Sequence, residues 1–158
     1  MKIRWSIAIN FIFIICISGL YFFRDFIFVN SNGQIEYLKD IIGNDYADNV
    51  PNYTHSRMVR FFGSWNIQTI IDFKWYMTMA FTVVFGIVTS LGLYITKTKR
   101  IAFYSMSIYI ICFVVAYLIS LIAYPVGRQI VGLLHSPIPY LILLIAGFIE
   151  TRIDKNYD

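Results

Sequence analysis

A histidine stands inside an apolar run near the end of the chain, in the stretch LLHSPIPYLILLIAG at residues 133–147. His135 is an ionisable group in a segment with the composition of a membrane span, and such groups are candidates for binding or catalysis. Tyr124 and Arg128 precede it, and Ser136 follows it. We expect these four residues to gather at one outward-facing pocket. The alternative is a structural role, in which the imidazole hydrogen-bonds a backbone carbonyl freed by the nearby prolines.

The prolines of this stretch predict where its helix is interrupted. With Ser136 as the N-cap, Pro137 and Pro139 occupy first-turn positions whose backbone N–H groups have no partner within the helix. Residues 137–149 then cover only about 20 Å of a hydrocarbon core that is about 30 Å thick. The span is therefore expected to break or kink at His135–Ser136, about 10 Å below the outer surface. Backbone that leaves the helix at that depth must be buried in protein or line a wet cavity.

The composition predicts the elements that position these residues. The chain has 158 residues, of which 58% are hydrophobic and 14% are charged. The apolar residues are concentrated in blocks, and about 20 of them in a row can cross a bilayer as a helix. We therefore predict an all-α polytopic membrane protein that forms a single membrane domain over residues 1–158. Its four predicted transmembrane helices cover residues 5–29, 75–96, 101–126 and 130–149.

Lysine and arginine residues predict the orientation, because cytoplasmic flanks carry an excess of them. The arrangement that fits places both termini in the cytoplasm. The inner side then holds Lys2, Arg4, the turn at 97–100, Arg152 and Lys155. The basic residues of the outer side are diluted in a long loop that also carries acids. The net charge of +4 is therefore a topology signal, and nucleic acid is not an expected partner.

The loop at residues 30–74 is predicted to form a small helical cap outside the membrane. Asn30–Gly33 has the composition of a turn, and the apolar residues of 34–42 fall on one face of a short helix. Ser64 can cap the next helix. That helix is expected to continue without interruption from about residue 65 to residue 96.

Five residues at the outer interface are candidates for contact with a partner protein. They are Arg24, Asp25, Arg57, Arg60 and Trp65. Arg24 and Asp25 are adjacent opposite charges between aromatic residues, which can anchor the helix or meet a partner helix. Arg57 and Arg60 stand three apart and could bind an anionic headgroup or a carboxylate, or pair with the acids of the loop itself.

Small and polar residues within the predicted spans indicate helix packing. Gly86 and Ser90 stand four apart, a spacing that lets two helices approach closely. Ser105 and Tyr109 share a face of the following span and could hydrogen-bond to another helix.

Other chemistry-bearing residues carry weaker signals. Cys16 and Cys112 are expected to be small buried residues at mid-bilayer depth. His55 with Asp45 and Asp48 matches no known metal spacing, so no metal and no cofactor is predicted. The sequence also contains no phosphate loop, nucleophile elbow or paired-histidine motif.

Three stretches of the sequence together resemble a known family. They are RDFIFVN at residues 24–30, RFFGSW at residues 60–65, and Lys74–Trp75 leading into Thr78 and a long apolar helix. Over about residues 5–150 the chain resembles small exosortase-associated membrane proteins of the exosortase X type in bacteria. The resemblance implies an accessory protein of the bacterial inner (cytoplasmic) membrane, serving an envelope protein-sorting or polymer-export system.

The same resemblance argues against the transpeptidase itself. Exosortases use an outward-facing cysteine together with arginine and histidine, whereas Cys16 and Cys112 are expected at a different depth. Our leading hypothesis is therefore a non-enzymatic accessory subunit that lies in the lipid bilayer and binds a membrane-protein partner. One alternative is an outer-leaflet lipid-handling enzyme that acts through His135 and Arg128. Another is a small transporter component, which a broken fourth helix would suit and which would require self-association.

Overall fold

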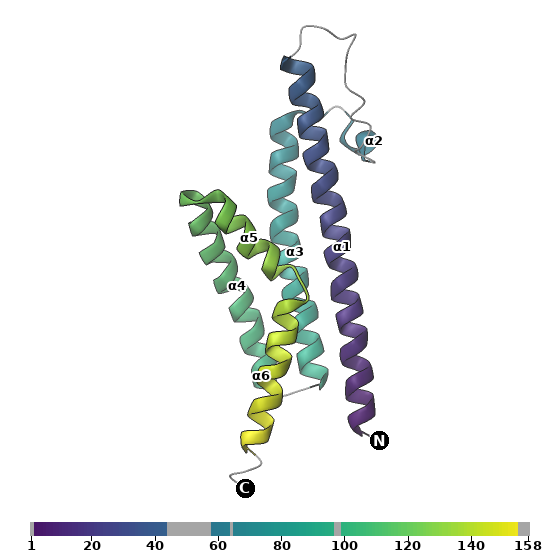
Figure 1. The fold of residues 1–158 in the computed structure, drawn as a ribbon, viewed down its shortest axis with the longest axis vertical. Helices are drawn as coiled ribbons and strands as arrows, with labels where there is room; N and C mark the ends of the chain where they lie inside the picture. Colours follow the sequence, from purple (N-terminus) through teal and green to yellow (C-terminus); the bar gives the residue numbers. More distant parts are fainter. Residues whose placement is uncertain (1, 44–57, 64, 97–98, 155–158) are drawn as a thin grey trace. The chain divides into compact units, whose positions relative to one another are not determined.

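The computed structural model describes residues 2–43, 58–63, 65–96 and 99–154, all of them in helices or in the short connections between helices. The helices are α1 (Lys2–Gly43), α2 (Val59–Phe62), α3 (Ile67–Thr96), α4 (Lys99–Ile122), α5 (Tyr124–Leu134) and α6 (Ile138–Asp154) (Figure 1). Within this described part, three helices are long and apolar enough to cross a membrane, and α5 with α6 makes a fourth if the bent pair is one span. The prediction of an all-α polytopic membrane protein is confirmed.

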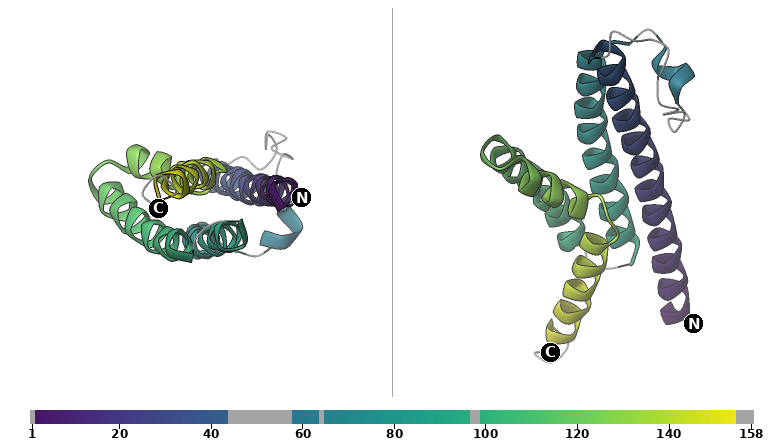
Figure 2. Two further views of the ribbon diagram at one scale, coloured as in Figure 1. Left: turned by 90° about the horizontal axis from the view of Figure 1, so that it is seen from below. Right: turned by 45° about the horizontal axis from the view of Figure 1, so that its top comes forward.

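The helices form two compact units. The first comprises residues Met1–Tyr21 and Phe81–Asp158, and the second comprises Phe22–Ala80. Helices α1 and α3 are each continuous, and each has one part in the first unit and the other part in the second unit. In the second unit, the later part of α1 and the first part of α3 run side by side in opposite directions (Figures 1 and 2).

The turn predicted at Asn30–Gly33 is wrong, because α1 passes through it without a break. Asn30 Nδ2 donates to the Phe26 carbonyl at 2.6 Å, and Ser31 Oγ donates to the Ile27 carbonyl at 2.7 Å. Asparagine and serine disfavour helices when their side chains bond to the backbone in other conformations, and here both bond backward within the helix instead. The helix predicted over 34–42 is therefore the last part of α1.

Helix α3 begins at Ile67 and runs without a break to Thr96, which confirms the long continuous helix predicted there. Ser64, predicted as its cap, lies outside the described residues. Asn66 caps the helix, because its Oδ1 accepts a hydrogen bond from the Thr69 backbone N–H at 2.8 Å. Amide oxygens at this position satisfy one of the unpaired N–H groups of the first turn.

The third predicted span, residues 101–126, is wrong at its end. Helix α4 ends at Ile122, and α5 begins at Tyr124 with Pro125 in its first turn. In a continuous helix the Pro125 ring would clash with the carbonyl four residues earlier, and proline also lacks an N–H donor. The chain bends at Ala123, whose φ of −137° is not helical. Helix α5 then turns back along α4, and the two stay adjacent in every view (Figures 1 and 2).

The predicted interruption of the fourth span is confirmed. Helices α5 and α6 meet at an angle of 57° across the break that contains His135. Because α5 starts at Tyr124, the broken span begins earlier than the predicted residue 130. Close packing holds α5 on α4, since a Cβ at Gly127 would lie 2.6 Å from Ser120 Cβ and 2.7 Å from the Ala116 carbonyl oxygen.

The predicted small-residue seam is confirmed between α3 and α4. A Cβ at Gly86 would lie 3.0 Å from Met106 Sδ, so the glycine permits the close approach. Ser90 Oγ and Ser105 Oγ lie 2.8 Å apart. Nearby, Tyr109 Oη on α4 hydrogen-bonds to Thr89 Oγ1 on α3. Hydroxyl groups therefore join the two helices, as the sequence indicated.

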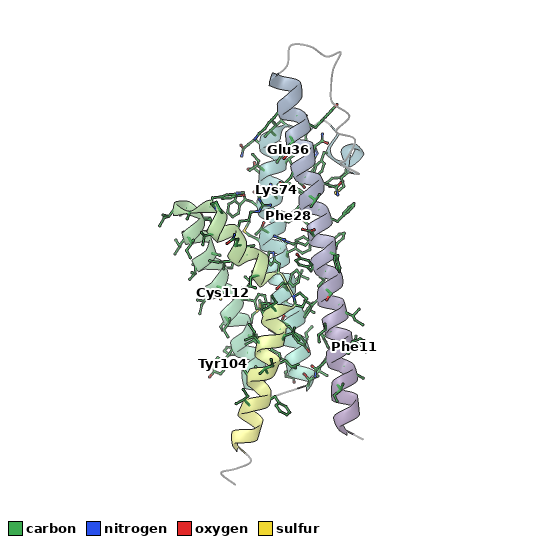
Figure 3. All side chains as sticks on the ribbon, viewed as in Figure 1. Phe11, Phe28, Glu36, Lys74, Tyr104 and Cys112 are labelled. Carbon is green, nitrogen blue, oxygen red and sulfur yellow. The ribbon has the colours of Figure 1, made fainter. Side chains whose placement is uncertain are left out.

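The outer sides of the first unit are apolar. Phe11 on α1 is 63% exposed and Tyr104 on α4 is 59% exposed, and both lie on the outside of their helices (Figure 3). Exposed apolar side chains on spanning helices are expected to contact lipid. The expectation that Cys16 is buried is wrong, because its thiol belongs to this exposed surface, while Cys112 is half-buried. The prediction used only the depth of Cys16 along the helix, and burial also depends on which face of α1 packs against other helices.

Candidate functional site

His135 is fully buried at the break between α5 and α6. Its Nε2 lies 2.8 Å from Thr82 Oγ1 on α3, and either atom can donate, depending on the histidine tautomer. Its ring stacks on Phe85, with centroids 5.3 Å apart and planes 16° apart, and lies 6.4 Å from the Phe81 ring. The sequence indicated none of these partners. They lie about 50 residues earlier in the chain, and only the packing of α3 against the break brings them together.

Ser136 stabilises the backbone at the break. Its Oγ donates to the Leu133 carbonyl at 2.6 Å and accepts from the Ile138 N–H at 3.2 Å. The first bond adds to the one that the Leu133 carbonyl already accepts from the Ser136 N–H at 3.1 Å, and the second satisfies an N–H group at the start of α6. Ser136 therefore caps the first turn of α6 as predicted, but the helix begins at Ile138, one residue later than expected. This capping also explains how an irregular segment is tolerated within an apolar span.

Tyr124 and Arg128 lie at the other end of α5 from His135. They stand four residues apart, so they share a face of the helix, and both are exposed. Arg128 is separated from His135 by seven residues, or about 10 Å along a helix. The structure thus brings His135 to Thr82 and Phe85 on α3, and leaves Tyr124 and Arg128 on the outer surface of α5.

The arrangement around His135 favours packing over catalysis. A general acid or base must reach the reacting group within hydrogen-bond distance, whereas this imidazole is enclosed by helices and bonded to a hydroxyl. Other polar side chains of the first unit act in the same way. Thr89 Oγ1 lies 3.1 Å from Tyr109 Oη, and Tyr140 Oη donates to Asn10 Oδ1 at 2.7 Å. Each of these bonds joins two different helices.

Metal binding finds no support in the described part of the chain. No group of three or more histidine, cysteine, aspartate or glutamate side chains is close enough there to hold an ion. His55, Asp45 and Asp48, considered above as ligands, lie outside the described residues.

The candidate partner contacts fall in or beside the second unit. Arg24 is half-buried, with its guanidinium carbon 4.7 Å from the centre of the Phe28 ring, a cation–π contact (Figure 3). Asp25, next in α1, is exposed. Arg57 lies outside the described residues, and Arg60 is in α2, but its side chain is not among those described.

Trp65 belongs to an aromatic cluster that joins α2 to α3. The cluster consists of Phe61, Phe62, Trp65 and Phe73, whose neighbouring rings are 5.3 to 6.0 Å apart. Phe62 is fully buried with Ile35 and Ile70, the core of this unit. Gly63 ends α2 with a φ of 38°, a conformation that glycine adopts without strain.

The exposed surface of the second unit changes from apolar to polar at the same level on both helices. On α1, the large exposed apolar side chains end at Val29, and on α3 they begin at Trp75, within the described residues. Just after Val29 on α1 and just before Trp75 on α3, the two helices are joined by a hydrogen bond, in which Lys74 Nζ donates to Asn32 Oδ1 at 2.6 Å (Figure 3). Beyond this bond α1 exposes Glu36 (Figure 3). Tryptophan and lysine are both favoured where a span leaves the hydrocarbon, so we expect the hydrocarbon core to end at this level.

Comparison of the chain with known protein families, curated proteins and solved structures finds no match.

Proposed function

We propose that this protein is a non-enzymatic accessory subunit that binds a second integral membrane protein through the exposed face of α1 around Asp25. Polar side chains buried in the first unit, such as His135 and Thr82, bond to one another and hold the helices together. The surface proposed to bind the partner is in the second unit, on the part of α1 that carries Asp25. The observation on which the proposal depends is the position of one exposed carboxylate.

Asp25 lies on an apolar face. Phe22 and Val29, three residues before and four residues after it, share that face of the helix and are 69% and 59% exposed. Val29 is the last large exposed apolar residue on α1, so Asp25 lies about 6 Å inside this edge. An aspartate facing acyl chains is unfavourable, by about 2.5–3.5 kcal/mol at the centre of a span and less near its ends. A basic side chain of a partner helix would remove this cost by pairing with the carboxylate.

The partner class follows from the resemblance described above. We expect an exosortase-like sorting enzyme or a polymer-export component in a bacterial inner membrane, with the termini of this chain in the cytoplasm. Its contact surface should carry an arginine or lysine at the level of Asp25, on a transmembrane helix with an apolar face. Self-association through the same face would require a basic group at that level on a second copy.

The experiment is co-purification of the tagged protein in mild detergent, comparing Asp25→Asn with Glu36→Gln. Both variants remove one exposed carboxylate from α1, but only Asp25 lies among exposed apolar residues. Losing one member of a desolvated charge pair costs about 2–5 kcal/mol, so Asp25→Asn should lower the amount of co-purified membrane protein at least about tenfold. Glu36→Gln should leave it unchanged. Equal recovery with both variants would contradict the proposed contact, and an exosortase among the bound proteins would identify the system.

A second candidate function follows from the bent span. A helix broken within the membrane is found in transporters, and an ionisable side chain inside a span is a candidate site for transport or for lipid handling at the outer leaflet. Here the enclosure of His135 by Thr82, Phe81 and Phe85 favours a structural role. Loss of transport or lipid turnover in His135→Ala, with normal folding and normal partner binding, would favour this second function over the first.

A further inference from the structure

Two neighbouring phenylalanines of α2 have opposite environments. Phe62 is fully buried, whereas Phe61 is 53% exposed, although its ring contacts Phe62, Trp65 and Phe73. The burial of Phe62 with Ile35 and Ile70 explains how α2 packs against α1 and α3 within the second unit. The exposed face of Phe61 is left uncovered by the packing of the residues that the structure describes.

We propose that α2 lies in the headgroup region of the bilayer and that lipid covers the exposed face of Phe61. The cap is then held to the membrane surface by α2 as well as by the spanning helices α1 and α3. The proposal assigns a lipid-binding surface to the loop between the first two spans, and it does not depend on the contact proposed at Asp25.

The level of Phe61 is set by its contact with α3. Its ring centre is 5.9 Å from that of Phe73. Phe73 precedes Trp75, where the exposed apolar surface of α3 begins, by two residues, which is about 3 Å of helix. Each headgroup region is about 5–8 Å deep, from the difference between the full bilayer and its hydrocarbon core. A ring in contact with Phe73 therefore lies within or beside this region.

The chemistry of the cluster suits that environment. Aromatic side chains are enriched at the membrane–water interface, where a ring can contact acyl chains while polar groups stay hydrated. Trp65, half-buried beside Phe61, has an indole N–H for the polar side. The exposed apolar surface of α3 begins at Trp75 and Tyr76, which are 40% and 69% exposed, roughly 3–5 Å along the helix from Phe73, the residue that the Phe61 ring contacts. This nearness in level favours lipid as the occupant over a soluble partner.

The experiment places an environment-sensitive fluorophore on single cysteines in nanodiscs of phosphatidylcholine. Cys16 and Cys112 are first replaced by alanine. The probe is then attached at Phe61→Cys and at the reference positions Gln68→Cys and Met79→Cys. Gln68 is exposed on α3 before the apolar surface begins, and Met79 is 42% exposed within that surface.

Spin-labelled lipid should quench the probe at residue 61 severalfold more strongly than the probe at residue 68, and to an extent similar to the probe at residue 79. Its emission should also be shifted to the blue relative to the probe at residue 68. Quenching of the residue 61 probe by aqueous iodide to the same extent as the residue 68 probe would overturn the proposal. Shielding from both quenchers would overturn it as well, because protein would then cover the ring.

A second measurement keeps Phe61 in place, in case the cysteine variant disturbs the cluster. In a protein with Trp5→Phe and Trp75→Phe, the remaining fluorescence comes from Trp65, whose ring centre is 5.3 Å from that of Phe61. Lipids brominated near the headgroup should quench this fluorescence. No difference between brominated and ordinary lipid would argue against insertion.

Discussion

Replacing Thr82 by valine removes one hydroxyl group from the described surroundings of His135. Valine has nearly the shape of threonine, so Phe81 and Phe85 should keep their places. The imidazole Nε2, which lies 2.8 Å from the Thr82 oxygen, then faces a methyl group. Both residues are within the packed interior, since Thr82 is 6% exposed and His135 is 0% exposed, so water does not replace the lost partner.

The expected destabilisation is set by two known effects. Leaving a buried polar atom without its partner costs about 1–3 kcal/mol in soluble proteins. Hydrogen bonds between membrane helices contribute less, on average about 0.6 and at most about 1.7 kcal/mol. For a fully enclosed imidazole we expect the upper part of the membrane range, so Thr82→Val should lower the free energy of unfolding by about 1–2 kcal/mol.

The assay is equilibrium unfolding in mixed micelles with increasing dodecyl sulfate, followed by circular dichroism. Ser120→Ala is the matched control, because the Ser120 hydroxyl bonds to the Tyr117 carbonyl of its own helix at 2.7 Å and joins no second helix. Ser120 is half-buried, but alanine keeps the Cβ that packs against Gly127 and removes only a hydroxyl in an exposed bond, so stability should change by less than about 0.5 kcal/mol. A double-mutant cycle with His135→Leu then isolates the pair, since two apolar side chains that replace both partners leave no orphaned group.

Two results would refute this account of His135. One is a Thr82→Val protein that is no less stable than Ser120→Ala. The other is an unchanged cost of Thr82→Val in the His135→Leu background, because the two residues would then act independently. Either result would reopen the possibility that the histidine is retained for binding or catalysis.

Two further predictions concern the packing of the first unit. Gly92→Ala should lower the free energy of unfolding by about 1–3 kcal/mol, because its Cβ would lie 2.8 Å from Tyr140 Cε2. Gly19→Ala, where no atom lies within 4 Å, should be neutral or stabilise the helix by about 0.5–1 kcal/mol, and equal effects of the two alanines in the same dodecyl sulfate titration would show that the close approach is not required. Tyr140→Phe removes the donor to Asn10 and should cost about 0.6–1.7 kcal/mol. In an Asn10→Leu background that cost should disappear, and its persistence would place the role of the Tyr140 hydroxyl elsewhere.

The sequence predicted best the features that depend on local chemistry. The break at His135 follows from a serine cap and prolines that stand within a few residues of it. The seam at Gly86 and Ser90 follows from side-chain size at helical spacing. In both places neighbouring residues alone decide the backbone geometry or the closeness of approach, so no knowledge of the rest of the fold is required.

The continuity of α1 through Asn30 and Ser31 could not be predicted from composition. Both residues favour turns in isolation because their side chains compete for the backbone. In the folded chain they are buried, at 5% and 0% exposed, between Ile27 and Ile35 on the packed stripe of α1. Burial of that stripe within the second unit outweighs the local preference, as tertiary packing commonly does for helices.

The surroundings of the candidate site were equally inaccessible to sequence reasoning. Thr82 is a small hydroxyl residue within an apolar span, and the hydroxyl of such a residue can equally bond to a carbonyl of its own helix, as that of Thr96 does with the Gly92 carbonyl at 2.7 Å. Its pairing with His135 depends on how α3 crosses the break. The expectation of a pocket with Tyr124 and Arg128 placed too much weight on nearness in sequence, because seven helical positions separate Arg128 from His135.

The length of a charged side chain decides which exposed charge requires a protein partner. Arg128 is exposed near the start of α5, but its long side chain can extend to the interface and keep its guanidinium hydrated. Asp25 has one methylene group between its carboxylate and the backbone, so it cannot reach water past Phe22 and Val29 in the same way. Under the proposed function, the pairing group for Asp25 comes from the partner helix. This asymmetry is the physical reason to search for the partner at α1 and not at the histidine.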